Sequence, residues 1–131
     1  MESLRNAGFE VKSYVVPPGE ESKSGQTYLE LLNFLAEIPL TRSDALVALG
    51  GGVASDAGKY FAENIIHAPL YSVPTALSVN ASFCYKAAIR MKDPYKSGAY
   101  NVVYKFYGLP QAICIDLDVI TGSKLLQRAQ A

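Results

Sequence analysis

One stretch, residues 46–60, constrains the fold more than any other: a short apolar run, three consecutive glycines and then a helical pattern. An apolar run of this length bounded by glycine favours a buried strand over a helix. Because Gly50, Gly51 and Gly52 have no Cβ, the backbone there can approach a ligand closely. A helix that begins at such a turn directs its free N–H groups and its positive dipole end to the same point. The stretch therefore predicts either a phosphate-binding loop, as in dinucleotide sites, or a tight strand-to-helix turn.

The glycine turn lacks both the G-x-G-x-x-G spacing and the Gly-Lys-Ser/Thr ending of a P-loop, so the rest of the chain must decide between these interpretations. Strands and helices alternate around it: strands are expected over 9–16, 45–49 and 70–73, and helices from about Ser22 to Pro39 and over 54–66. This alternation predicts an α/β fold, a Rossmann-like parallel sheet with flanking helices. Ligands of such sheets bind outside the carboxyl ends of the strands. Three loops would open at that edge: 17–20, 50–52 and 74–76.

The segment after Leu77 predicts a β-hairpin excursion from the sheet. Residues 85–91 and 101–107 are aromatic and β-branched, and a polar stretch with proline and glycine separates them. A buried strand is expected over 112–116, followed by a polar amphipathic helix that continues toward the end of the chain.

The bulk composition excludes several classes of function. Lys plus Arg and Asp plus Glu number 12 each, so the net charge favours neither nucleic acid nor an anionic membrane as a partner. No apolar run reaches the roughly 20 residues of a membrane helix, and no signal-peptide core is present, so a cytoplasmic protein is expected. Cys84 and Cys114 are expected to be small buried hydrophobes, and the single histidine, His67, to cap a helix end. Because most zinc or iron sites use two or more histidines, no metal site is expected within the chain.

Three groups of residues resemble motifs of the 3-dehydroquinate synthase-like superfamily, which also contains glycerol, glycerol-1-phosphate and iron-containing alcohol dehydrogenases. Residues 19–23, Gly-Glu-Glu-Ser-Lys, with Thr27 are similar to the synthase element G-E-x-x-K-x-x-x-T. Residues 48–53, Ala-Leu-Gly-Gly-Gly-Val, with Asp56 are similar to A-L-G-G-G-V-x-x-D. The third group is Val-Pro-Thr at 73–75 with the later Pro-Gln-Ala and Ile-Asp-Leu-Asp. The resemblance runs from about Leu4 to the end of the chain.

The resemblance implies that the chain binds NAD (or NADP) at this edge of the sheet. The glycine loop would hold the dinucleotide, Asp56 would lie near the nicotinamide, and Thr75 would line the cofactor. Glu20 and Lys23 would reach the adenosine ribose, whose hydroxyls a carboxylate can bind. Simpler alternatives exist: Glu20 and Asp56 can stabilise the N-termini of their helices, and Lys23 can be solvated. The implied cofactor-binding residues are Glu20, Lys23, Gly50, Gly51, Gly52, Val53, Asp56 and Thr75.

Two further residues, Asn80 and Lys86, are the candidate catalytic residues, and they match different members of the superfamily. Asn80 stands where the synthase has an aspartate, at a spacing after Thr75 like that of the dehydrogenases. Lys86 keeps the spacing of the synthase lysine from that position, although in a strand it can equally face solvent. The longer match at Glu20 and Lys23 favours the synthase. The segment after Thr75, which lacks two glycines of the synthase motif, favours a dehydrogenase.

The resemblance covers only part of the superfamily's architecture. There, zinc or iron is held by an acidic residue and two histidines of a helical C-terminal domain, which would begin where this chain ends. The superfamily's first strand would precede this chain. We therefore expect residues 1–118 to be the NAD-binding α/β domain of a longer, metal-dependent enzyme and 119–131 to start the linker helix. The divalent metal is expected only in that parent enzyme.

The parent enzyme would act on a small polyol or sugar-phosphate substrate. As a synthase it would oxidise the substrate transiently with NAD, eliminate phosphate and return the hydride; as a dehydrogenase it would leave the hydride on the nicotinamide. The chain alone is expected to be inactive, either as a nucleotide-binding module or as a fragment that binds nothing. An open sheet edge and an apolar face predict a homodimer or a strand-exchanged oligomer.

Overall fold

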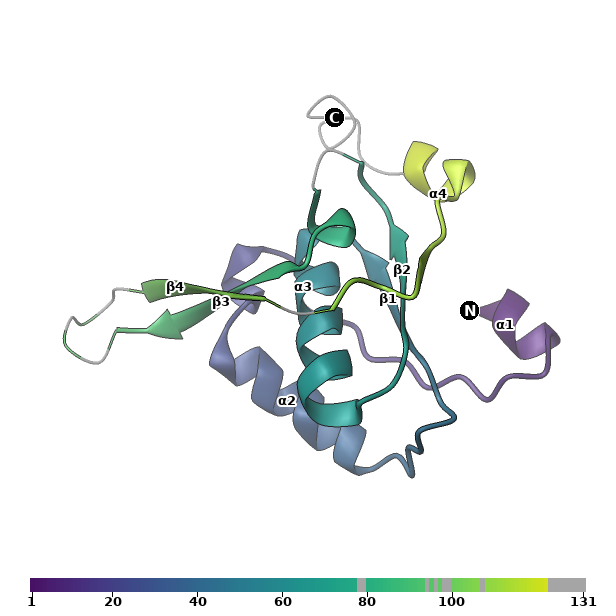
Figure 1. Ribbon diagram of the computed structural model, residues 1–131, viewed down its shortest axis with the longest axis horizontal. Coiled ribbons are helices and arrows are strands. Elements are labelled where there is room, and N and C mark those ends of the chain that lie inside the picture. The colour runs from purple at the N-terminus through teal and green to yellow at the C-terminus, as the bar shows by residue number, and fades with distance from the viewer. Residues whose placement is uncertain (78–79, 94, 96, 98–99, 107, 123–131) are drawn as a thin grey trace.

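Figure 1 shows the computed structural model of the chain, which describes residues 1–77, 80–93, 95, 97, 100–106 and 108–122. The longer helices are α2 and α3, and short helical turns (η) connect several elements; η2 is π-helical. The elements are α1 (Glu2–Asn6), η1 (Glu20–Ser22), α2 (Gly25–Ala36), β1 (Leu46–Gly50), α3 (Gly52–Phe61), η2 (Ala62–Ile66), β2 (Leu70–Pro74), η3 (Asn80–Phe83), β3 (Lys86–Lys92), β4 (Tyr100–Phe106), β5 (Ala112–Ile113) and α4 (Leu117–Thr121).

A parallel sheet in the order β1-β2-β5 forms the centre of the structure. β1 and β2 pair from Leu46 opposite Leu70 to Gly50 opposite Pro74, and β5 adds a short pairing to β2. The helices α3 and η2 connect β1 to β2, as a parallel pair requires. The predicted α/β class is therefore confirmed, and the loops after Gly50 and Pro74 open at the same edge.

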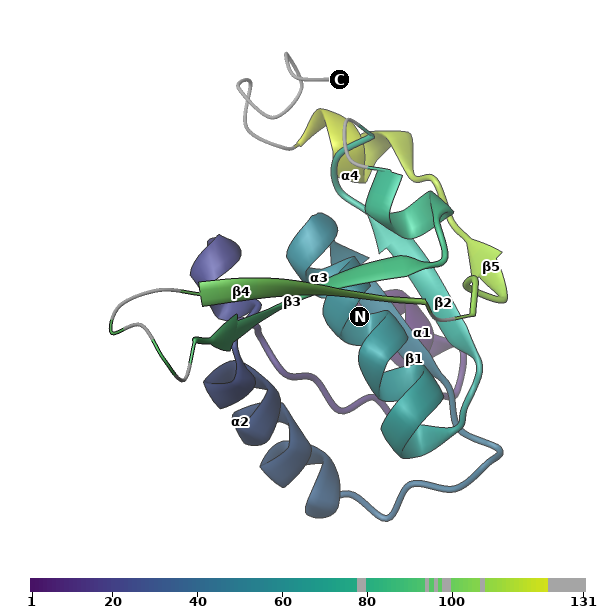
Figure 2. The same cartoon turned by 60° about the vertical axis from the view of Figure 1, so that its left-hand side comes forward.

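One face of this sheet packs against α3. Ala48 of β1 and Leu70 and Ser72 of β2 point to that face and are buried. Gly58 permits the close approach of the helix, because a Cβ there would lie 2.8 Å from the Cβ of Ala48 and 3.2 Å from Cδ1 of Leu70. Figure 2 shows α3 lying beside β1 and β2, with the hairpin crossing in front of the helix.

Aromatic side chains join α2 and α3 in the main core. Tyr28 of α2 meets Phe61 of α3 edge-on, with ring centroids 5.6 Å apart, and stacks on Tyr60 at 5.0 Å. Leu35 of α2 and Ile89 of β3 belong to the same buried cluster. Since aromatic rings bury large apolar areas, this cluster holds α2, α3 and the hairpin together.

The hairpin of β3 and β4 is antiparallel and projects away from the sheet (Figure 1). Its strands lie within one residue of the predicted ranges 85–91 and 101–107, so the predicted excursion is confirmed. The Arg90 amide donates a hydrogen bond to the carbonyl of Lys23, at 2.7 Å, which fastens β3 to the segment before α2.

The predicted strand over 9–16 is wrong. This segment has no assigned secondary structure. In the part of the chain that the structure describes, the sheet partner of β1 is β2, and residues 9–16 join no ladder. A strand needs a neighbour to satisfy its backbone groups, and the apolar pattern of 9–16 could not show that the neighbour is missing.

Other predicted elements are displaced or shorter. The helix expected from Ser22 begins as η1, and α2 starts only at Gly25, because the Ser24 hydroxyl caps it by accepting from the amide of Thr27 at 3.3 Å. The strand expected over 112–116 is limited to Ala112–Ile113, and none of residues 112–116 is buried, so the predicted buried strand is wrong. The chain turns soon afterwards into α4, which Asp116 caps. The predicted trailing helix falls mostly on residues 123–131, which lie outside the described residues.

The other face of the sheet is apolar and exposed. Val47, Leu49 and Tyr71 retain 43%, 54% and 39% of their accessible surface. The expected homodimer or strand exchange stays a prediction, as does the domain boundary after residue 118. Across the described residues, no helix combines the length and the apolarity that crossing a membrane requires.

Replacing Gly58 by alanine tests the contact between α3 and the sheet. The added methyl group must displace Ala48 or the helix, so we expect a loss of about 1–3 kcal/mol in unfolding free energy, measured by urea denaturation. Gly25→Ala is the matched control, because a Cβ at Gly25 would meet no atom within 4 Å. Equal stability of the two variants would contradict the close packing.

Candidate functional site

The glycine turn lies at the carboxyl end of β1, as the sequence predicted. Gly50 has φ of +152°, and a Cβ there would lie 2.7 Å from the Cβ of Ala54, so a side chain is excluded both by the backbone conformation and by space. The Gly50 carbonyl accepts a hydrogen bond from the Thr75 amide at 3.1 Å. This bond holds the loops after β1 and β2 side by side.

Gly51 is the N-cap residue of α3, and the cap has no side-chain hydrogen bond. A Cβ on Gly51 would meet no atom within 4 Å, and residues 50–53 line a broad groove, so the helix N-terminus adjoins open space. The first amides of an α-helix have no partner within the helix, and the helix dipole makes this end positive. Gly51, Gly52 and Val53 therefore form a turn that can receive an anionic group such as a pyrophosphate.

A buried ion cluster follows this turn directly. The Asp56 carboxylate accepts from two ammonium groups: Lys23 Nζ lies 2.9 Å from Oδ2, and Lys59 Nζ lies 3.2 Å from Oδ1. The Ala88 amide also donates to Oδ2, at 3.2 Å. Lys23 reaches outward to Glu20 as well, at 3.2 Å. The cluster thus joins η1, α3 and β3 through one carboxylate.

The charge on Lys23 is stabilised by its partners. Burial acts to lower the pKa of Lys23, but the hydrogen bonds and charges of Asp56 and Glu20 together outweigh it, and the pKa lies above its ordinary value. Lys23 therefore stays protonated throughout the neutral range. Its burial and its ion pair with Asp56 rule out the alternative in which Lys23 is simply a solvated side chain.

The two predicted ribose ligands, Glu20 and Lys23, differ in how exposed they are to solvent. The side chains of Lys23 and Asp56 are 9% and 6% exposed and bind each other, whereas Glu20 is 57% exposed. Glu20 is thus the carboxylate that a ligand can reach. Lys23 forms an ion pair with Glu20 on the protein side, and Asp56 in turn forms an ion pair with Lys23.

Lys59 was not singled out from the sequence, yet its side chain is the most deeply buried of the cluster. It is fully inaccessible to solvent, and its ammonium donates to the carbonyls of Ala81 at 2.7 Å, Cys84 at 3.2 Å and Lys86. The spacing of Asp56 and Lys59, which puts them one turn apart on a helix, is the sequence signal that could have indicated the pair.

Three serines form a second buried polar group that the sequence did not indicate. The hydroxyls of Ser55 and Ser82 lie 2.7 Å apart, and the Ser72 hydroxyl donates to that of Ser82 at 3.0 Å. The group joins α3, β2 and η3. Serines occur throughout the chain, and no spacing among these three marks them as partners.

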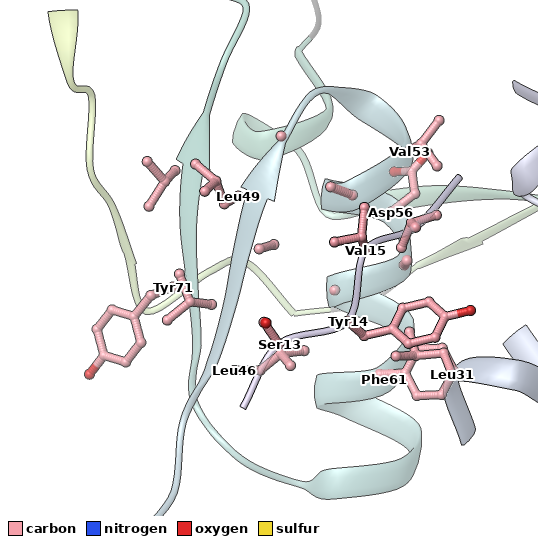
Figure 3. Close-up of a pocket in the computed structure, with 18 of the residues that line it drawn as sticks. Ser13, Tyr14, Val15, Leu31, Leu46, Leu49, Val53, Asp56, Phe61 and Tyr71 are labelled. Atoms are coloured by element: carbon pink, nitrogen blue, oxygen red, sulfur yellow. The ribbon is translucent and has the colours of Figure 1, made fainter. Parts of the chain in front are cut away.

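The candidate catalytic residues lie in η3 and β3, which both pack against α3. Asn80 begins η3 and Lys86 begins β3, and both side chains are exposed. Both line the same broad groove as Asp56 and the glycine turn. Figure 3 shows part of the lining of this groove, to which the N-terminal segment contributes Tyr14 and Val15 and α3 contributes Asp56 and Phe61.

The remaining candidate ligands do not form a site. Among the described residues, no group of three or more His, Cys, Asp or Glu side chains could hold a metal ion. His67 is exposed and ends η2 in a left-handed conformation, with φ of 52°, so the backbone turn terminates the helix. Cys114 is exposed, so the prediction that both cysteines are buried is wrong; Cys84 is half-buried.

Comparison with known proteins identifies the family of the chain. Residues 1–123 match the family described as iron-containing alcohol dehydrogenase. The 3-dehydroquinate synthase of Clostridium botulinum (strain Alaska E43 / Type E3) is 38% identical over 122 residues, which are 91% of this chain and 33% of that protein. The 3-dehydroquinate synthase of Enterococcus faecalis (strain ATCC 47077 / OG1RF) is 40% identical over 120 residues, 89% of this chain and 32% of that protein.

Solved structures share the fold. Glycerol dehydrogenase from Schizosaccharomyces pombe superposes with a TM-score of 0.71 and 29% identity, over 96% of this chain and 29% of that one. A 2-deoxy-scyllo-inosose synthase, complexed with carbaglucose-6-phosphate, NAD⁺ and Co²⁺, gives a TM-score of 0.66 and 26% identity, over 84% of this chain and 29% of that one. The chain spans about a third of the length of the curated relatives it matches.

Replacing Asp56 by alanine tests the buried cluster. The change leaves Lys23 and Lys59 facing each other with no carboxylate between them, so we expect a loss of about 3–5 kcal/mol in unfolding free energy. Glu10→Ala is the matched control: Glu10 pairs with Lys12 at 2.9 Å on the surface, and such pairs contribute at most about 1 kcal/mol. Similar losses in both variants, measured by denaturant unfolding, would contradict the role of Asp56.

Proposed function

The chain belongs to the iron-containing alcohol dehydrogenase family, as its motifs predicted, and on that premise we propose that it is the NAD-binding part of an enzyme resembling 3-dehydroquinate synthase. Since the chain spans about a third of its curated relatives, the activity of a whole enzyme is part of the proposal.

The observation that carries the proposal is the open turn between β1 and α3. Gly50 makes the turn, Gly51 leaves free space in front of the helix, and the first amides of α3 face that space with the positive end of the helix dipole. These features fit the pyrophosphate of a dinucleotide. Val53 and Thr75 flank the turn and would contact the bound cofactor.

The adenosine end of the cofactor would be held by Glu20. Its exposed carboxylate can accept both ribose hydroxyls, and Lys23 limits its freedom by pairing with it. A carboxylate at this place repels the 2′-phosphate of NADP, so the site should favour NAD. Asp56 would lie toward the nicotinamide, but most of its accepting capacity is already used by Lys23, Lys59 and the Ala88 amide.

The substrate side of the proposal rests on Asn80 and Lys86, which border the same groove. The synthase is preferred because Glu20 and Lys23 match its motif and the curated relatives named above are synthases. A polyol dehydrogenase is the second candidate, because Asn80 replaces the synthase aspartate and a glycerol dehydrogenase shares the fold.

The described residues do not fit a divalent metal. No acidic or imidazole cluster of three groups comes together among them, so the described residues alone do not form a complete metal site. We therefore propose that these residues bind the cofactor, and we propose no metal site among them. Bound NAD would supply the hydride acceptor, and the chain would hold it in place.

Calorimetric titration of the chain with NAD tests the cofactor proposal. We expect saturable binding at millimolar or lower NAD, and weaker binding of NADP. Glu20→Gln should weaken NAD binding by about tenfold, since hydrogen bonds to a charged group contribute roughly 1.5–3 kcal/mol, and should narrow the preference over NADP. Glu10→Gln, a surface carboxylate in an exposed pair, is the control and should leave the affinity unchanged. Absence of binding at millimolar NAD would reject the proposal.

Product analysis distinguishes the synthase from the dehydrogenase in a protein that carries this segment together with the metal-binding domain. A synthase should release phosphate from a seven-carbon sugar phosphate without net NADH. Steady NADH production from glycerol, glycerol 1-phosphate or another alcohol would instead establish the dehydrogenase.

A further inference from the structure

The ammonium group of Lys59 occupies a cage of oxygen atoms inside the protein. Its neighbours are Asp56 Oδ1 at 3.2 Å and the carbonyl oxygens of Ala81 at 2.7 Å, Cys84 at 3.2 Å and Lys86. An ammonium has three protons, and four oxygens surround it, so no donor remains for a ligand. The side chain is fully inaccessible to solvent. Lys59 therefore cannot act by touching a cofactor or a substrate.

The cage explains why a charged residue is found in the interior. The carbonyls of Ala81 and Cys84 lie in and just after η3, and the last carbonyls of a helix have no partner within it. Lysine side chains can satisfy such carbonyls, and burial away from water makes an unsatisfied carbonyl costly. Asp56 compensates the charge that the lysine brings.

We propose that Lys59 is a positioning residue that fixes the segment 80–88 to the helix that begins at the glycine turn. Lys59 lies two turns along α3, an axial rise of about 10 Å from the first residue of the helix. One rigid helix thus carries the cofactor turn at its start and the cage in its third turn. Asn80 and Lys86, which the proposed function places at the substrate side, border the segment that the cage holds.

Two other residues of α3 also bind the segment 80–88, and they show what is particular to Lys59. Ser55 of α3 meets Ser82 through their hydroxyls at 2.7 Å, and Asp56 accepts from the Ala88 amide at 3.2 Å. Three residues of α3 therefore hold 81–88 at separate points. Lys59 differs from the other two because it gathers three backbone carbonyls with one group.

Hydrogen exchange on the 131-residue chain tests the inference with Lys59→Met, which removes the ammonium and leaves Asp56 paired with Lys23. We expect exchange in the segment 81–88 to become at least tenfold faster, with less than threefold change in β1 and β2. Lys12→Met, at an exposed pair, is the control and should change neither. Unchanged exchange in 81–88, or equal acceleration throughout the sheet, would overturn the positioning role.

Amine rescue separates the lost hydrogen bonds from the lost volume. Lys59→Ala removes the equivalent of propylammonium, so added propylammonium should slow exchange in 81–88 again, whereas tetramethylammonium, which has no N–H donors, should not. Equal effects of the two salts, or none from either, would contradict the cage. If neither variant folds, the unmutated protein decides: slowly exchanging Lys59 ζ protons in ¹⁵N NMR support the cage, and ζ protons that exchange as fast as those of exposed lysines overturn it.

Measuring the NAD affinity of the Lys59→Met variant tests the positioning role of Lys59 independently of the proposed cofactor binding. Since the ammonium does not face the glycine turn, we expect NAD affinity within about threefold of the unmutated protein. A larger loss of affinity would show that Lys59 supports the cofactor turn and would overturn the assignment to 80–88. If the unmutated chain binds no NAD, the proposed function fails, while the exchange experiment still decides the role of Lys59.

Discussion

The structure depends on one carboxylate, that of Asp56, which pairs with two buried ammonium groups. Lys23 comes from the segment before α2 and Lys59 from α3, and without the carboxylate their charges would repel each other in a region of low dielectric constant. The Ala88 amide adds the hairpin to the same group. The elements around the glycine turn are therefore held together by buried ion pairs as well as by the aromatic core.

This arrangement divides the candidate site into a part that meets the ligand and a part that supports it. Glu20 and the glycine turn face open space and can bind a cofactor. Lys23 and Asp56 lie behind Glu20 and bind each other, while Lys59 binds Asp56 and the carbonyls of the segment 81–86. The motifs group Glu20, Lys23 and Asp56 together as cofactor ligands, but only Glu20 is exposed enough to bind a cofactor. The motif alone does not distinguish a residue that contacts the cofactor from a buried residue that holds that ligand in place.

The sequence predicts the fold and the turn well, because both follow from local patterns. Three glycines after an apolar run indicate the strand-to-helix turn, and alternating elements indicate the parallel sheet. The buried cage of Lys59 could not be predicted, because its carbonyl partners lie more than 20 residues away and any residue type can supply a carbonyl. The strand expected over 9–16 failed for a related reason, since pairing depends on a neighbour that a local pattern does not contain.

The central claim, that the cofactor binds at the start of α3, is tested most directly by amide chemical shifts during an NAD titration. The account predicts that the largest shift changes occur at Gly51, Gly52 and Val53, with smaller ones at Glu20 and Thr75. It also predicts little change on the exposed outer face of β1 and β2. Shift changes centred on that outer face, with the glycine amides unmoved, would contradict it.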